Sequence, residues 1–423
     1  MIYLDNAATT MSKPPQVVDA VVRAMTTFGG VGRGVHAPAL AADAAVHRAR
    51  QALADLLGAP SASRVAFCAN ATEALNTAIC GLAAQGDHVI TTAASHNSAL
   101  RPLYRLRDAG TIDLDIAPIG PDGALDYGAL EALFRPGTRL IVATHASNLT
   151  GDVYDIERIA RMAHDHGARL LVDAAQTAGT WPLDMGAQGL DVVAFTGHKG
   201  LFGPQGTGGL CVAEGVDIRP LLVGGSGVRS FDERHPPFMP ERLEAGTLNA
   251  HGIAGLGAGA SFILEEGLEN VSRHDARLAE LFRAGAAEVP GVRILGGGDG
   301  GRCAIVALNV GERDSGEVAF RLDREFGICA RAGAHCAPLM HRALGTAEQS
   351  AVRFSFSYLN TEAEVASALD ALRAIAAGGV SGGSPCGMKH AIPPPEAAGR
   401  RSENAAAEGP RQEERSDPSW KRR

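Results

Sequence analysis

The sequence predicts an α/β fold with a mostly parallel central sheet and a second, smaller α+β domain. Between about residues 60 and 215, short apolar runs alternate with helix-like patterns, which is typical of βαβ units. After about residue 250 a long helical pattern is followed by a mixture of strands and helices. The chain has 423 residues, 45% of them hydrophobic, and can therefore bury more than one large core.

Seven short apolar runs are the expected strands of the central sheet. They cover residues 64–68, 88–91, 114–117, 140–143, 170–172, 192–195 and 210–212. Helices are expected between them, among others at 72–84, 125–134 and 155–166. Ligands of such sheets bind beyond the carboxyl ends of the strands, so the residues that follow each run are the candidates for a site.

The second half of the chain begins with a Gly-rich, poorly periodic stretch at 224–249. A long helical pattern then covers about 253–288, and a strand is expected at 304–308, a helix at 316–326, a strand at 352–357 and a last helix at 362–376. We expect an N-terminal segment (1–20) that joins the small domain, a large domain (21–255) and a small C-terminal domain (256–377). Residues 378–423 lack apolar periodicity and are expected to form a disordered tail.

The charge of the chain excludes some classes of partner. A formal net charge of -8 provides no basic field for nucleic acid or an anionic membrane, so a small-molecule substrate is favoured. The opening MIYLDNAATT lacks the features of a signal peptide, and no run approaches the roughly 20 apolar residues of a membrane span. A cytoplasmic protein is therefore expected.

Seven cysteines are dispersed along the chain without CxxC spacing, which argues against a disulfide framework and against a metal site. Most are expected to be small buried hydrophobic residues. Cys336 differs, because its neighbours are polar, small or turn-forming, and it is a candidate nucleophile, with a spectator thiol as the alternative. Cys386, in the tail, is interpreted as an incidental thiol, with a sulfur relay as the alternative.

Two neighbouring strands end in residues that suit one cofactor. Asp173 closes the run at 170–172 and could cap a helix or direct a charge into a cleft. Lys199 follows His198 in a Gly-rich loop after the run at 192–195, a setting that suits a Schiff base. A carboxylate for a pyridinium nitrogen and an amine for an aldehyde are what pyridoxal phosphate requires.

The phosphate of such a cofactor needs backbone N–H groups and hydroxyls at a helix N-terminus. A strand ending near Cys68 and a helix beginning near Thr72 supply them, although an ordinary helix cap would look the same. Thr196 and His198 recur at the same sheet edge and strengthen the phosphate interpretation.

Several sequence motifs occur along the chain in the same order as in a known enzyme family. They lie at residues 3–10 (YLDNAATT), 32–36 (GRGVH), 95–97 (SHN), 147–151 (SNLTG), 173–176 (DAAQ), 196–199 (TGHK), 244–249 (EAGTLN) and 331–336 (RAGAHC). From Tyr3 to about Ala376 the chain resembles the cysteine desulfurase family of class V aminotransferase-fold enzymes, in particular its group II and selenocysteine lyase-like members. The resemblance implies a pyridoxal-phosphate-dependent transferase of fold type I.

The resemblance also implies a role for individual residues. Lys199 would hold the cofactor covalently, Asp173 would contact the pyridine nitrogen, Gln176 the ring oxygen, and His96 would stack on the ring and assist proton transfers. The phosphate would be held by Ala71, Thr72, Thr196 and His198, with Thr247 reaching it from the other subunit of a homodimer. The substrate carboxylate would be bound by Asn148, Arg331 and Arg353, and Asn148 would also contact the cofactor. Cys336 would be the nucleophile.

The activity implied is conversion of L-cysteine to L-alanine, with the sulfur held as a persulfide on Cys336 until an acceptor protein or a small thiol takes it. Sulfur metabolism, including iron–sulfur cluster assembly, is the implied setting. The loop departs from the family pattern, because Ala332 and Ala334 replace polar residues and one residue is missing before Pro338. Arg331 and His335 flank the thiol and could lower its pKa.

Three alternatives stay open at this point. A selenocysteine lyase would use the same site for the selenium analogue. Another class V aminotransferase, epimerase or lyase would need Lys199 but not Cys336. A non-catalytic interaction protein with a degenerate site would bind no cofactor.

Overall fold

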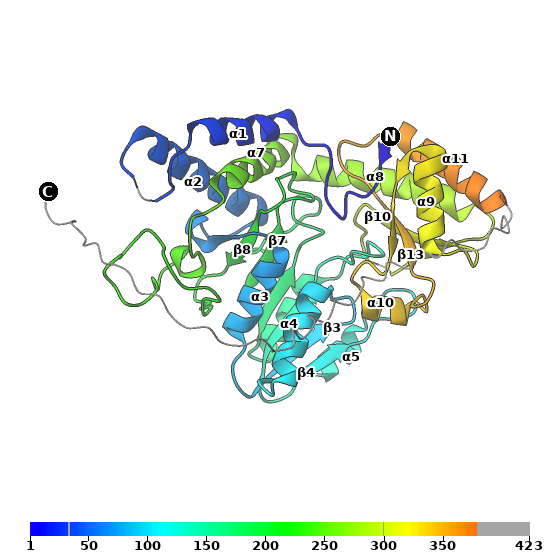
Figure 1. Ribbon diagram of the computed structural model, residues 1–423. Helices are drawn as coiled ribbons and strands as arrows, with labels where there is room; N and C mark the ends of the chain where they lie inside the picture. The colour runs from blue at the N-terminus through cyan, green and yellow to red at the C-terminus, as the bar shows by residue number, and fades with distance from the viewer. Residues whose placement is uncertain (33, 299, 379–423) are drawn as a thin grey trace, which may run out of the picture. The chain divides into compact units, whose positions relative to one another are not determined.

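Figure 1 shows the computed structural model of the protein. The structure describes residues 1–32, 34–298 and 300–378. The expected disordered tail and Cys386 lie outside these residues, apart from Gly378 at the end of the last helix. Within the described part of the chain, no helix combines the length and apolar character that crossing a membrane requires.

The central sheet has seven strands, in the order β2-β8-β7-β6-β5-β3-β4. Their bounds are β2 (Val65–Cys68), β3 (Asp87–Thr92), β4 (Ile112–Ala117), β5 (Thr138–Thr144), β6 (Arg169–Asp173), β7 (Val192–Thr196) and β8 (Gly208–Val212). Neighbouring strands are parallel except at β8, which is antiparallel to both β2 and β7. The mostly parallel sheet and the positions of all seven predicted strands are confirmed.

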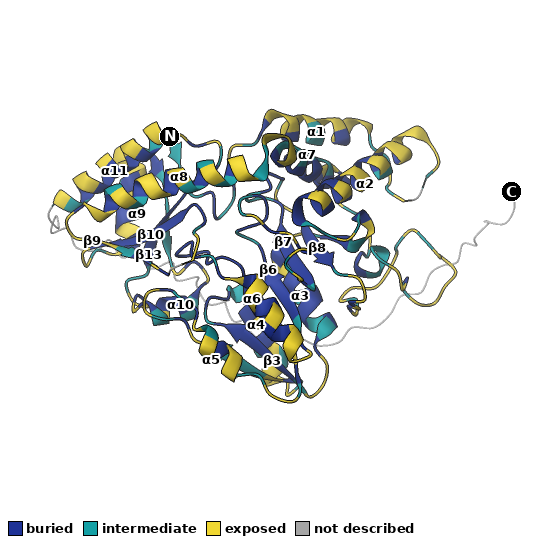
Figure 2. Ribbon diagram, turned by 180° about the vertical axis from the view of Figure 1, so that it is seen from behind, coloured by how far each residue is buried: buried dark blue, intermediate teal, exposed yellow. Residues whose placement is uncertain are grey.

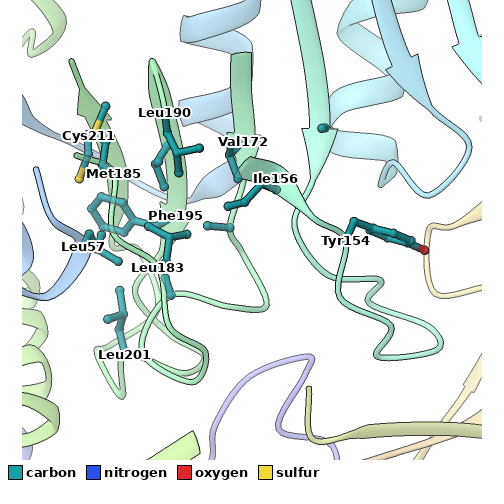
Figure 3. Packing of buried hydrophobic residues seen from close by; sticks show 14 of the residues in the cluster. Leu57, Tyr154, Ile156, Val172, Leu183, Met185, Leu190, Phe195, Leu201 and Cys211 are labelled. Atoms are coloured by element: carbon teal, nitrogen blue, oxygen red, sulfur yellow. The ribbon is translucent and has the colours of Figure 1, made fainter. Parts of the chain in front are cut away.

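Both faces of this sheet are buried, because successive side chains of each strand point to opposite faces. In β7, Val193 and Phe195 belong to one hydrophobic cluster, and Val192 and Ala194 to another. β7 and β8 are accordingly buried along their whole length, whereas the edge strand β4 is only partly buried (Figure 2). Figure 3 shows part of the first cluster, to which Phe195, Leu57 and Met185 belong.

Helices cover the two faces of the sheet. The first cluster includes residues of α2 (Ala37–Leu57), α6 (Ile156–Asp165) and α7 (Ala250–Glu266). The second includes residues of α3 (Ala71–Leu82) and α4 (Asn97–Asp108). Side-chain oxygens cap several of these helices, as Asn70 does for α3 by accepting from the N–H of Glu73 at 3.0 Å. The remaining helices of this part are α1 (Pro15–Thr27) and the short α5 (Tyr127–Ala132).

The helical pattern expected at 253–288 is confirmed, but it is divided between two helices. The structure has two helices, α7 and α8 (Leu268–Ala287), separated by Gly267. Gly267 has φ 83°, a left-handed conformation that glycine adopts without a steric cost. Apolar periodicity continues across the break, and for that reason the pattern did not reveal it.

A second, four-stranded sheet has the order β12-β13-β10-β9. Its strands are β9 (Val292–Leu295), β10 (Ile305–Val310), β12 (Arg331–Gly333) and β13 (Ala351–Ser355). Its hydrophobic cluster includes residues of α8, α9 (Ser315–Phe326) and α11 (Glu362–Ala377). The short α10 (Pro338–Ala343) follows β12. β1 (Ile2–Tyr3) pairs in parallel with β11 (Ile328–Cys329), so the N-terminal segment runs alongside this part of the chain.

One buried carboxyl group in α8 leads to a stability prediction. Asp275 is 3% exposed, and its Oδ1 has no hydrogen-bond partner among the described residues. Burial raises the pKa of Asp275 well above its usual value. The folded state therefore retains a proton that the unfolded chain loses above about pH 4, and stability falls as the pH rises from there toward the folded pKa.

We expect Asp275→Asn to raise the Tm by roughly 1–3 °C at pH 8, because the amide has no charge to lose. The gain should grow as the pH is raised from 5 to 8 in thermal unfolding monitored by circular dichroism. Asp370→Asn, at an exposed position in α11, is the matched control and should change little. An Asp275→Asn gain that is equal at both pH values would show that ionisation is not the cause.

Candidate active site

A cavity of about 230 Å³ lies at the carboxyl ends of the central strands. β5, β6 and β7 each place their last residue in its wall, as Thr144, Asp173 and Thr196. Parallel strands end at the same sheet edge, so residues far apart in the sequence converge there. The second sheet contributes Arg331 from β12 and Arg353 from β13.

The N-terminal segment also contributes to this cavity, where Ala7 and Ala8 form part of the wall. The backbone N–H of Thr10 donates to the carbonyl of His198 at 3.0 Å, and its hydroxyl donates to the carbonyl of Lys199 at 2.8 Å. These bonds hold the loop that carries Lys199 in place.

Lys199 and Asp173 both line the cavity, as predicted. Burial lowers the pKa of Lys199 to about 8, and the nearby Arg353 acts in the same direction. About a tenth of this amine is therefore unprotonated and nucleophilic at pH 7, far more than at the usual pKa of a lysine. Asp173 is 5% exposed, and burial raises its pKa although its Oδ1 accepts from the N–H of Ala175 at 3.0 Å. A cationic group beside this carboxylate would offset the cost of its burial.

His96 precedes α4 and its Nδ1 accepts from the N–H of Ser98 at 3.0 Å. Burial lowers the pKa of His96 to about 4, with Lys199 and Arg331 as further causes. The ring is therefore neutral at pH 7, and because Nδ1 is an acceptor, its proton lies on Nε2. A neutral ring in the cavity wall can stack on a flat aromatic ligand.

Polar groups that suit an anion gather near the N-terminus of α3. Thr72 lies in its first turn, and its Oγ1 is 2.7 Å from the Oγ of Ser98. Thr196 and His198 line the same cavity, and burial lowers the pKa of His198 to about 4. A Cβ on Gly208 would lie 2.8 Å from the Cα of Asn70, so glycine is needed for β8 to approach this helix end.

Arg331 and Arg353 are direct partners in the antiparallel pairing of β12 and β13, which places their side chains on one face. Arg353 is 1% exposed and donates to the carbonyl of Asn148 and to Oδ1 of Asp5, both at 2.8 Å. Its Nε is buried without a partner among the described residues. The pair of guanidinium groups makes this side of the cavity cationic, as binding of a carboxylate requires.

Cys336 is exposed and lies outside the main cavity, on an adjoining groove that shares Thr72, His96 and Ser98 with it. The carbonyl of Cys336 accepts from the N–H of Asn97 at 2.9 Å, and the carbonyl of His335 accepts from Nδ2 of Asn148 at 2.6 Å. His335 and Cys336 have φ values of 48° and 56°. Left-handed backbone at two successive non-glycine residues is strained, and such strain is concentrated at functional sites.

His335 cannot supply a positive charge to the thiol, contrary to the expectation from sequence. Burial lowers the pKa of His335 to about 3, so its ring is neutral, and its Nε2 lies 3.1 Å from the carbonyl of Ala351. Its role here is to hold the loop against β13.

The structure brings nearly all of the predicted site residues together around one cavity. Those that line it are Ala71, Thr72, His96, Asn148, Asp173, Gln176, Thr196, His198, Lys199, Arg331 and Arg353. Thr247 is exposed and does not line the cavity. Sequence reasoning missed Thr144 and Ser98; the signal for Thr144 was its place at the end of a predicted strand, like Asp173.

These residues fit pyridoxal phosphate. Thr144 Oγ1, Thr196 Oγ1, His198 Nδ1 and Arg353 Nε are buried and unpartnered among the described residues, and all four side chains belong to the cavity wall. Buried polar atoms are nearly always paired, so the site is built for a polar ligand. Asp173 suits a pyridinium nitrogen, Lys199 an aldehyde, and the α3 N-terminus with Thr72 a phosphate.

Comparisons with known proteins agree with this chemistry. Residues 2–367 match the family Aminotransferase class-V. A probable cysteine desulfurase of Methanothermobacter thermautotrophicus is 36% identical over 375 residues, which cover 86% of this chain and 92% of the relative. A cysteine desulfurase of Escherichia coli O127:H6 is 33% identical over 351 residues, covering 80% of this chain and 85% of the relative.

Solved structures show the same similarity. An apo cysteine desulfurase from Thermococcus onnurineus NA1 has a TM-score of 0.83 at 32% identity, covering 89% of this chain and 94% of its own. The cysteine desulfurase CsdA from Escherichia coli has a TM-score of 0.79 at 30% identity, covering 88% of this chain and 93% of its own. The chain therefore belongs to the class V aminotransferase family, and within it to the cysteine desulfurases.

Proposed function

We propose that the protein is a pyridoxal-phosphate-dependent cysteine desulfurase, which converts L-cysteine to L-alanine and keeps the sulfur as a persulfide on Cys336. Pyridoxal phosphate, when bound, supplies the electron sink that weakens bonds to the α-carbon of the amino acid. Lys199 would hold it covalently, Asp173 would contact its ring nitrogen, and Gln176 its ring oxygen. Thr72, Thr196 and His198, with the Ala71 backbone, would bind its phosphate.

The chain's own residues would orient the substrate and move its protons. Arg353, with Arg331 and Asn148 beside it, would bind the α-carboxylate of cysteine. The Lys199 amine, with a pKa lowered to about 8, would act as the base that takes the α-proton. His96 would lie against the ring of the cofactor and hold a proton on Nε2.

The sulfur step would belong to Cys336. Its thiolate attacks the sulfur of the bound cysteine, a S–S bond forms, and the C–S bond breaks. The electron pair of that bond stays on the carbon, which takes up a proton, so that alanine leaves and Cys336 carries a persulfide. No external oxidant or reductant is needed for this step.

One observation supports the proposal above all. A cavity that fits the cofactor adjoins a groove with an exposed thiol on a strained loop, and three residues are common to both. The test is to incubate the purified, cofactor-loaded protein with cysteine and a thiol, and to measure alanine and sulfide. Release of both in equal amounts is expected, and release of neither would refute the proposal.

We also propose that the active form is a homodimer in which Thr247 of one subunit reaches the phosphate site of the other. Thr247 is exposed within the irregular 224–249 segment, whose neighbourhood also exposes Val223 and Phe231. Exposed apolar side chains of this kind are typical of subunit interfaces. Light scattering after size-exclusion chromatography should give the mass of a dimer at micromolar concentration. A monomer that keeps its cofactor and full activity would contradict this.

A further inference from the structure

The groove beside Cys336 has a volume of about 390 Å³ and extends away from the cofactor cavity along α4. Besides Cys336, it is lined by Arg101 and Arg105 of α4 and by Asn76 of α3, and none of the described Asp or Glu residues lies in its wall. Both arginines are exposed. Neither forms an ion pair with a described residue, and Arg105 donates a hydrogen bond only to the sulfur of Cys80, at 3.1 Å.

The two arginines and the thiol form one row. Asn97, Arg101 and Arg105 are four residues apart and therefore share a face of the helix. Helical rise places the two arginine backbones about 6 and 12 Å from Asn97 along the axis. The backbone N–H of Asn97 donates a hydrogen bond to the backbone carbonyl of Cys336. The end of the row that starts at Asn97 therefore lies next to the residue that carries the thiol.

We propose that this groove binds the sulfur acceptor, and that the acceptor is a small thiol carrying carboxylate groups. This inference rests on the proposed function. A volume of about 390 Å³ suits a small molecule. Two arginines without carboxylate partners in the described part of the chain favour an anion, and a thiolate can take the outer sulfur of a persulfide by exchange.

The transfer balances without a further reagent. The acceptor thiolate attacks the outer sulfur of the Cys336 persulfide and a new S–S bond forms. The bond between that sulfur and Cys336 breaks, and Cys336 leaves as a thiolate. The acceptor becomes a persulfide, and Cys336 is ready for the next cysteine.

The test compares mercaptosuccinate, which has two carboxylates, with neutral 2-mercaptoethanol as acceptors for the cofactor-loaded enzyme turning over cysteine. In the double variant Arg101→Gln/Arg105→Gln, kcat/KM for mercaptosuccinate should fall about tenfold, and that for 2-mercaptoethanol should change less than about twofold. Arg107→Gln, which removes one charge from the same helix outside the groove, is the control and should change neither value. Equal losses with both thiols, or none, would overturn the inference.

A second measurement does not depend on turnover. The rates at which anionic iodoacetate and neutral iodoacetamide alkylate Cys336 are compared by mass spectrometry. The ratio of the iodoacetate rate to the iodoacetamide rate should fall about tenfold in the double variant and stay unchanged in Arg107→Gln. An unchanged ratio in the double variant would contradict the inference that Arg101 and Arg105 attract anions to the groove. Failure of the proposed function is a separate outcome, because wild type would then release no alanine from cysteine with either thiol.

Discussion

Lys199→Ala is expected to abolish both covalent attachment of the cofactor and turnover of cysteine. One amine would perform both tasks, and no other lysine that the structure describes lines the cavity. Loss of a positioned base alone typically costs 10²–10⁴-fold, so activity should fall at least about 10³-fold. Lys199→Arg keeps the charge without a nucleophilic amine and should be equally inactive.

Attachment can be measured independently of activity. Borohydride reduction of the loaded protein, followed by peptide mass mapping, should label the peptide that contains Lys199. Lys13→Gln is the matched control, because Lys13 lies close by, where its Nζ contacts the hydroxyl of Thr10 at 2.9 Å. The control should still be labelled at Lys199. A labelled Lys199→Ala protein would mean that another residue holds the cofactor.

Cys336→Ala should remove sulfur transfer and leave cofactor binding intact. The side chain lies outside the cofactor cavity, so its loss should not disturb the residues that bind the ring or the phosphate. Release of alanine and sulfide from cysteine should fall at least about 10²-fold, because no nucleophile remains for the substrate sulfur. The visible absorbance of the bound cofactor should persist.

Cys329→Ala is the control for this variant, since Cys329 lies in β11 and lines neither the cofactor cavity nor the groove beside Cys336. It should retain full activity. An undiminished rate in Cys336→Ala would show that the thiol takes no part in the reaction.

If wild type also lacked desulfurase activity but transaminated another amino acid, the proposed function would be replaced by that of a class V enzyme that does not use Cys336. Parallel assays with selenocysteine would separate a selenocysteine lyase from a cysteine desulfurase.

Local patterns predicted much of this site. Asp173 and Thr196 were identified because each follows an apolar run, and the parallel sheet places such residues at one edge. Asn70 and Thr72 lie where strand and helix patterns meet, so a helix N-terminus was expected there. These features depend on residues close together in the sequence, and periodicity records them well.

Long-range contacts decided what the patterns did not contain. The sequence by itself determined the α/β class, the strands and the strand-end residues, because backbone periodicity follows from local composition. Only the tertiary structure decided the break at Gly267, the bond from Arg353 to Asp5, the burial that leaves His335 neutral and the position of Cys336 on a separate groove. Burial, ion pairing and pKa depend on which distant segments pack together, and a local pattern carries no record of that packing.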